Sequence, residues 1–131
     1  MDVLDEYMNE LTIDTSLDEF SMRDVQMKLP AIKHKWAGRL IRTKIQIAAL
    51  QKKRQGIIDS AIKQLIEQSP IKLSIPLARQ RVESLDSVTE ISSEISHTKL
   101  IVEFLEKIER ILSSMTFDIK NLTEIMKLET Q

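Results

Sequence analysis

The sequence contains no cysteine among its 131 residues. Without thiols the chain can form no disulfide, no zinc–thiolate site and no cysteine nucleophile. It is also poor in residues that make turns and sheets, with two glycines, three prolines and 4% aromatics. The core must therefore consist of Ile, Leu, Val, Met and Ala, a composition that favours helices. We predict an all-α protein with long antiparallel helices preceded by short N-terminal helices.

Signals for membrane insertion and for catalysis are also missing. The chain opens with acidic residues and has no long apolar run, so we expect neither a secretory signal nor a membrane span. His34 and His97 lie far apart, without the paired spacing of a metal site. Gly38 and Gly56 do not form a phosphate-binding loop. We expect a non-enzymatic binding protein that needs no cofactor and no metal.

Acidic residues are missing from one long stretch, residues 25–58, although the net charge of the whole chain is only −1. The preceding segment is mostly acidic, and the chain becomes acidic again after Arg81. Helix faces in solvent usually carry both signs, so a block of one sign predicts an anion-binding surface. The bases of this stretch are Lys28, Lys33, Lys35, Arg39, Arg42, Lys44, Lys52, Lys53 and Arg54.

A long helix is predicted from Ala31 to about Gln68, because this segment has no proline and keeps a helical period. Pro30 suits its first turn, where the missing N–H is harmless. At 1.5 Å per residue the helix would span about 55 Å, so only other long helices or other subunits could cover its apolar stripe. The stripe consists of Ile32, Trp36, Leu40, Ile47, Leu50, Ile58, Ala61 and Leu65.

The bases of this helix form a ribbon beside the stripe. Lys35, Arg39, Arg42 and Lys53 fall within an arc of about 60° on one flank, with Lys33 and Lys44 on the other. Such a ribbon suits a nucleic-acid backbone, and without a short recognition helix we expect single strands. Trp36 is expected in the core rather than stacked on bases, so binding should be salt-sensitive and indifferent to sequence. The predicted DNA-binding residues are Lys33, Lys35, Arg39, Arg42, Lys44, Lys52, Lys53 and Arg54.

Shorter elements flank the long helix. The apolar residues from Val3 to Leu11 predict one amphipathic helix, and the capping-box spacing of Ser16 and Glu19 predicts that a second begins there. Ser69-Pro70 should end the long helix, and residues 71–76 should form an extended crossover. We therefore divide the chain into a DNA-binding region at 1–69, a linker at 70–76 and an oligomerisation region at 77–131.

The C-terminal region shows two apolar faces in succession. A helical pattern resumes at Val82 and continues to Leu112, and a break is predicted at Ser113–Thr116, where Thr116 could cap a last helix. The two faces are candidates for self-association, unless they only close the core of the monomer. The predicted oligomerisation residues are Leu100, Phe104, Ile108, Phe117, Leu122 and Ile125.

Several segments together resemble a known family. These are Ile13-Asp14-Thr15-Ser16, Lys33-His34-Lys35-Trp36 followed by Gln51-Lys52-Lys53, and the run from Val102-Glu103-Phe104-Leu105 to Phe117-Asp118-Ile119-Lys120-Asn121. In order and spacing they resemble the phage recombination mediators of the UvsY type. Where that family has Lys-Ala-Arg-Leu, this chain has Gly56-Ile57-Ile58-Asp59, so no DNA role is carried to those positions. Met115-Thr116-Phe117 replaces the family's Arg-Gly-Phe.

This resemblance implies a ring-like homo-oligomer that binds single-stranded DNA. It also implies contacts with the phage single-strand binding protein and with a RecA-like phage recombinase that the mediator helps to load. The place of action would be the cytoplasm of the infected bacterial host.

Two other functions are compatible with the residues alone. The chain could be a helical scaffold or coiled-coil adaptor whose basic helix pairs with an acidic protein partner. The acidic N-terminal segment could itself be that partner within an oligomer. A membrane-surface helix has less support, because such helices favour exposed Trp, Phe and Leu beside their bases.

Overall fold

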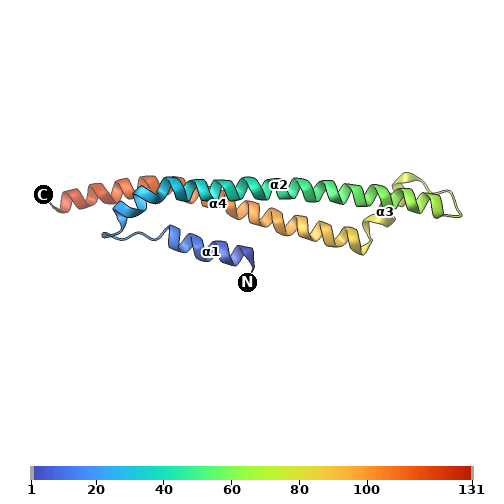
Figure 1. The fold of residues 1–131 in the computed structure, drawn as a ribbon, viewed down its shortest axis with the longest axis horizontal. Helices are drawn as coiled ribbons and strands as arrows, with labels where there is room; N and C mark the ends of the chain where they lie inside the picture. Colours follow the sequence, from blue (N-terminus) through green and yellow to red (C-terminus); the bar gives the residue numbers. More distant parts are fainter. Residues whose placement is uncertain (1, 131) are drawn as a thin grey trace. The chain divides into compact units, whose positions relative to one another are not determined.

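The computed structural model describes residues 2–130, and these residues form four α-helices and no strand (Figure 1). The helices are α1 (Val3–Asp14), α2 (Met22–Gln68), α3 (Ile75–Glu83) and α4 (Asp86–Glu129). Helix α2 has 47 residues and α4 has 44. The prediction of an all-α fold with long helices is thus confirmed. None of the helices in the described part of the chain is long and apolar enough to cross a membrane.

The chain packs as two compact units, and each long helix contributes to both. Unit 1 consists of the residues up to Ile41 and those from Ile101 onward, and unit 2 is Arg42–Leu100. The packing therefore groups the two ends of the chain rather than the segments before and after residues 70–76. The division into a DNA-binding and an oligomerisation region concerns function and stays a prediction.

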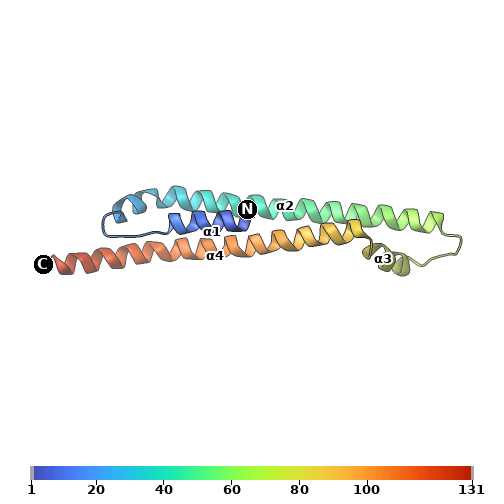
Figure 2. The same cartoon turned by 90° about the horizontal axis from the view of Figure 1, so that it is seen from below.

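Unit 1 has an aliphatic core around one tryptophan. Trp36 and Leu40 of α2 pack against a stripe of α4 whose members recur every three or four residues. Helix α1 lies beside both helices, as Figures 1 and 2 show, and packs Tyr7 and Leu11 against this core. Each fully buried side chain contributes roughly 1.5–3 kcal/mol. The stripe of α4 consists of Ile101, Leu105, Ile108, Leu112, Met115 and Ile119.

Unit 2 has a smaller core that joins α2, α3 and α4. Ile58 of α2 packs with Val82 of α3 and Val88 of α4. Helix α3 begins one residue after Ser74, whose Oγ accepts a hydrogen bond from the Leu77 N–H, and Pro76 lies in its first turn. The predicted extended crossover is therefore limited to residues 69–74, because Pro76 belongs to α3.

No helix begins at Ser16, so the prediction of a second short helix there is wrong. A turn occupies the segment instead, and Asp18 holds it: its Oδ1 accepts hydrogen bonds of 2.8 Å from the N–H groups of Phe20 and Ser21. These two bonds, that of Ser21 first, lower the pKa of Asp18. Phe20, which a second short helix would carry on its apolar face, is 94% exposed.

Helix α2 begins at Met22, so Pro30 lies inside the helix and not in its first turn. An interior proline removes one backbone hydrogen bond and costs about 3 kcal/mol or more. Burial on both sides of the proline offsets this cost: Met22 and Leu29 are buried before it, and Trp36 is buried after it.

Helix α4 runs without a break through Ser113–Thr116, so the predicted interruption and the last helix capped by Thr116 are wrong. Met115 and Ile119 are 3% and 2% exposed and extend the buried stripe of α4 past this segment. Their burial outweighs the weak helix propensity of the serines and the threonine. The helix continues without interruption through Met115-Thr116-Phe117.

Candidate nucleic-acid interface

All eight predicted DNA-binding residues lie on α2, but they belong to different units. Lys33, Lys35 and Arg39 are in unit 1, and the other five, from Arg42 to Arg54, are in unit 2. Arg42, Lys44, Lys52 and Lys53 are exposed, whereas Arg54 is half-buried. Among the described residues, neither Lys52 nor Lys53 forms an ion pair. These two lysines are therefore accessible to an anionic ligand.

Helix α1 brings the carboxylates of Glu10 and Asp14 into contact with Lys35 and Arg39 of α2. Lys35 Nζ lies 2.6 Å from Asp14 Oδ2 and 3.3 Å from Glu10 Oε2. The Arg39 guanidinium forms a two-pronged pair with the Glu10 carboxylate. Glu10 and Asp14 are four residues apart, so both face the same side of α1. Two of the eight predicted cations are therefore already neutralised within the chain.

Trp36 lies under this cluster of charges and is 0% exposed. Its Nε1–H donates a 2.9 Å hydrogen bond to Asp14 Oδ2, and its ring meets Tyr7 edge-on at 5.4 Å. The Arg39 guanidinium lies 4.7 Å from the centre of the Trp36 ring, a cation–π distance. The prediction that Trp36 is a core residue is confirmed, and a base cannot stack on it in this arrangement.

Glu10 and Arg39 each stabilise the charged form of the other. The hydrogen bond from Arg39 lowers the pKa of Glu10, and the same bond raises the pKa of Arg39. Burial opposes both shifts but is the smaller effect. The Glu10 side chain is 38% exposed, so water screens the pair and its net contribution is about 1 kcal/mol or less.

Two other predicted cations are fixed by neutral hydroxyl groups. Lys33 Nζ donates to Thr116 Oγ1 at 3.0 Å, which links α2 to α4 within unit 1. Arg54 Nε donates to Ser92 Oγ at 2.8 Å, which links the same helices within unit 2. Because a hydroxyl carries no charge, both cations keep their full positive charge for an anion.

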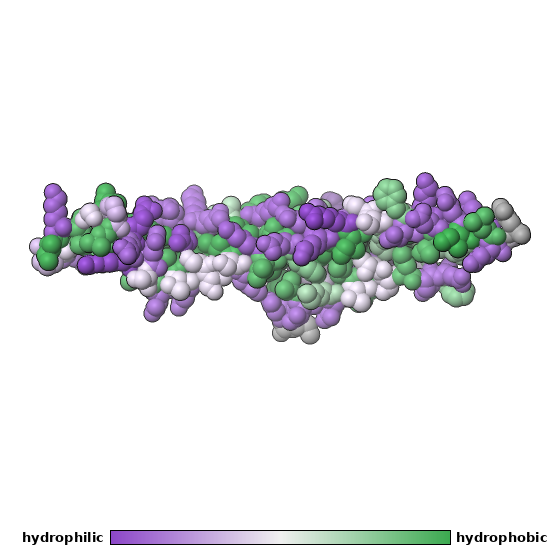
Figure 3. Space-filling model, turned by 180° about the vertical axis from the view of Figure 1, so that it is seen from behind, coloured by the Kyte–Doolittle hydropathy of each residue, from purple (hydrophilic) through white to green (hydrophobic). Residues whose placement is uncertain are grey.

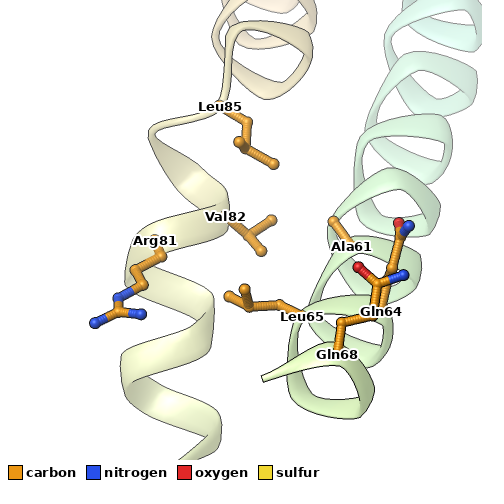
Figure 4. Close-up of a pocket in the computed structure, with 7 residues that line it drawn as sticks. All are labelled: Ala61, Gln64, Leu65, Gln68, Arg81, Val82 and Leu85. Carbon is orange, nitrogen blue, oxygen red and sulfur yellow. The ribbon is translucent and has the colours of Figure 1, made fainter. Parts of the chain in front are cut away.

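A hollow of about 240 Å³ in unit 2 has a different character. Figure 4 shows Ala61 and Leu65 of α2 facing Val82 and Leu85, while Arg81 points away. These apolar side chains border the small core of unit 2 and bring no pair of reactive groups together. The hollow is part of the packing of unit 2.

The predicted oligomerisation residues separate into buried and exposed ones. Ile108 is 0% exposed and belongs to the core of unit 1, so it is a core residue and has no surface to offer an interface. Phe104 packs against the same core. Four of the six remain accessible and are 40–69% exposed: Leu100, Phe117, Leu122 and Ile125. Figure 3 shows that hydrophobic side chains reach the surface among hydrophilic ones on the drawn face.

The fold is that of the helical phage recombination mediators. Crystal structures of the bacteriophage T4 recombination mediator protein UvsY match this chain with TM-scores of 0.83 (lattice type IV) and 0.81 (lattice type II), both at 12% identity. The first match covers 96% of this chain and 98% of that chain, and the second covers 100% and 99%. At such low identity the likeness concerns the fold alone.

The sequence itself matches the family described as "Recombination, repair and ssDNA binding protein UvsY" over residues 6–130. The chain belongs to the UvsY family. The resemblance drawn from its short segments is thereby confirmed. The comparison with curated proteins gives no match.

Acid should loosen α1, because the pairing of Glu10 with Arg39 needs the ionised carboxylate. The pKa of Glu10 is lower in the folded chain than its ordinary value of 4.5. The stabilisation by the pair is therefore complete above pH 4.5, and it is lost as the pH falls through the pKa that Glu10 has in the folded chain. Trp36 is the only tryptophan. We therefore expect its fluorescence to shift to the red in acid, and Glu10→Gln to show the shift at neutral pH.

Glu6→Gln is the matched control, since Glu6 is an exposed glutamate on the same helix. Its acid transition should equal that of the parent. An unchanged acid transition in Glu10→Gln would show that the pair does not hold α1 in place.

Proposed function

We propose that this protein is a recombination mediator that binds single-stranded DNA and helps to load a RecA-like phage recombinase onto strands coated with single-strand binding protein. It would act in the cytoplasm of the infected bacterial host. The observation that carries the proposal is the cationic surface of α2, on which no acid interrupts residues 25–58, in a chain of the UvsY family.

Helix α2 suits the backbone of a single strand rather than its bases. Lys52 and Lys53 are exposed on one turn, and Arg54 is held beside them by its hydrogen bond to Ser92. Phosphates repeat along a strand at a spacing that such a row can follow, and each neutralised phosphate releases counterions. No exposed aromatic lies among these bases, so affinity should come from charge and not from stacking.

One observation favours a second function, a helical adaptor that binds an acidic protein partner. Helix α1 itself is an acidic helix on the basic face of α2, through Glu10 and Asp14. An acidic helix of another protein would find comparable partners at Lys52 and Lys53. The adaptor requires no DNA affinity, so a DNA titration separates the two functions.

Binding to a mixed-sequence oligonucleotide should weaken steeply with salt. If the predicted cations other than Lys35 and Arg39 neutralise about six phosphates, the slope of log K against log salt should be about −4. The double variant Lys52→Gln and Lys53→Gln should reduce the slope by about 1.4. Fluorescence anisotropy over a range of salt concentrations measures both values.

The matched control is the double variant Lys35→Gln and Arg39→Gln, which removes two cations of the same helix. Because Glu10 and Asp14 already neutralise them, its slope should change by less than that of the other double variant. Absence of binding at low salt would exclude the DNA function and leave the adaptor.

Recombinase loading is tested separately. The protein alone should hydrolyse no nucleotide, and it should shorten the lag of filament formation by a RecA-like recombinase on strands coated with single-strand binding protein. Filament growth can be followed by light scattering. An equal lag with and without the protein would exclude the mediator function, whatever its DNA affinity.

We also propose that the protein works as a ring-like homo-oligomer joined through the exposed apolar residues of α4. Phe117 is 69% exposed and Ile125 is 50% exposed. Two different patches that meet around a closed circle give a ring. A ring would hold many weak phosphate sites together, so that each acts at a high effective concentration for the next.

Charges on the exposed residues should therefore reduce the size of the assembly without unfolding it. For Phe117→Glu combined with Ile125→Glu we expect a smaller species in multi-angle light scattering, unchanged helicity in circular dichroism and much weaker DNA binding. The contrasting variant is Ile108→Glu, which buries an unpaired charge and should lose several kcal/mol of stability and unfold. A double variant as large as the parent would exclude these residues from the interface.

A further inference from the structure

A polar groove lies in unit 2, on the side of α2 that carries Arg54. It has a volume of about 280 Å³ and is lined by Gln51 and Arg54 of α2 and by Ser92, Ile95 and Lys99 of α4. The lining contains two cations, two neutral hydrogen-bonding groups and no acid. Ile95 is 7% exposed, so an apolar side chain lies beneath the polar ones.

The helical period places the lining residues of α2 on one face of that helix and those of α4 on one face of the other. Gln51 and Arg54 are three residues apart on α2, and Ser92, Ile95 and Lys99 recur at intervals of three and four on α4. The hydrogen bond of 2.8 Å from Arg54 Nε to Ser92 Oγ ties the two helices together at this point. It also fixes the guanidinium plane, so less conformational freedom is lost when Arg54 binds a ligand.

We propose that this groove binds a phosphate group of a nucleic-acid strand, with Arg54 and Lys99 as its cationic ligands. The inference rests on the proposed DNA function and goes beyond it, because Lys99 lies outside the basic stretch of α2. Arginine offers a planar fork to two phosphate oxygens, and lysine adds a compact charge. The amide of Gln51 can donate a further hydrogen bond.

The charge balance of the groove supports a phosphate rather than a carboxylate side chain of the protein. Within the described residues Lys99 forms no ion pair, although Glu94 and Glu103 are near it in the sequence. The volume is several times the roughly 30 Å³ that one water molecule occupies in the liquid, so a phosphodiester fits together with water.

The test is the salt dependence of binding to a mixed-sequence single strand, measured for the full chain. Lys99→Gln should make the slope of log K against log salt less steep by about 0.7 for each Lys99 that contacts the strand, and Lys99→Arg should restore it. Lys107→Gln is the matched control, since Lys107 is an exposed lysine on the same helix and does not line the groove. It should leave the slope unchanged.

A second measurement addresses the source of the phosphate. In nuclear magnetic resonance the Arg54 Nε–H signal should shift on addition of the oligonucleotide and much less with inorganic phosphate at the same concentration of phosphate groups. If the parent binds DNA and Lys99→Gln has the same slope as the parent, the groove is not a phosphate site while the DNA function stands. If the parent does not bind DNA, the proposed function fails, and this inference fails with it.

Discussion

Two helices of 47 and 44 residues make up most of the chain, and each can bury its apolar stripe only against other helices. Aliphatic burial is therefore the interaction on which everything else depends. In unit 1 it joins α2, α4 and α1 around Trp36, and in unit 2 it joins α2, α3 and α4 around Ile58. Because aromatic residues are few, the stability of the core comes from many small aliphatic side chains and not from a few large aromatic ones.

This packing decides which charges are available. Helix α1 is attached to the core of unit 1 through Tyr7 and Leu11, and that attachment brings Glu10 and Asp14 onto Lys35 and Arg39. In unit 2 the meeting of α2 with α4 brings Lys99 beside Arg54. Hydrophobic packing thus leads to the neutralisation of Lys35 and Arg39 in unit 1, and it places a further cation, Lys99, near Arg54 in unit 2. The distribution of accessible charge on the surface therefore differs from the distribution of charge along the sequence.

Sequence periodicity was sufficient for the long helices and for their apolar stripes, because Trp36, Leu40 and Ile58 follow the helical period. It was not sufficient for the helix ends. Local rules placed a helix start at Pro30 and a break at Ser113–Thr116, whereas the burial of Leu29 and Met115 overrides both. Such burial depends on residues tens of positions away. A local pattern contains no information about them.

The candidate site shows the same limit. The basic block predicts that α2 is the anion-binding helix, yet no property of Lys35 alone distinguishes it from Lys53. The difference is the acidic face of α1, which a helical reading of Glu10 and Asp14 could have revealed as a match for two bases four residues apart. Weak, screened pairs of this kind hold α1 only in concert with its apolar contacts. In the proposed DNA function the accessible cations would act together in the same way, since a single phosphate contact is weak and a series of contacts along one strand is not.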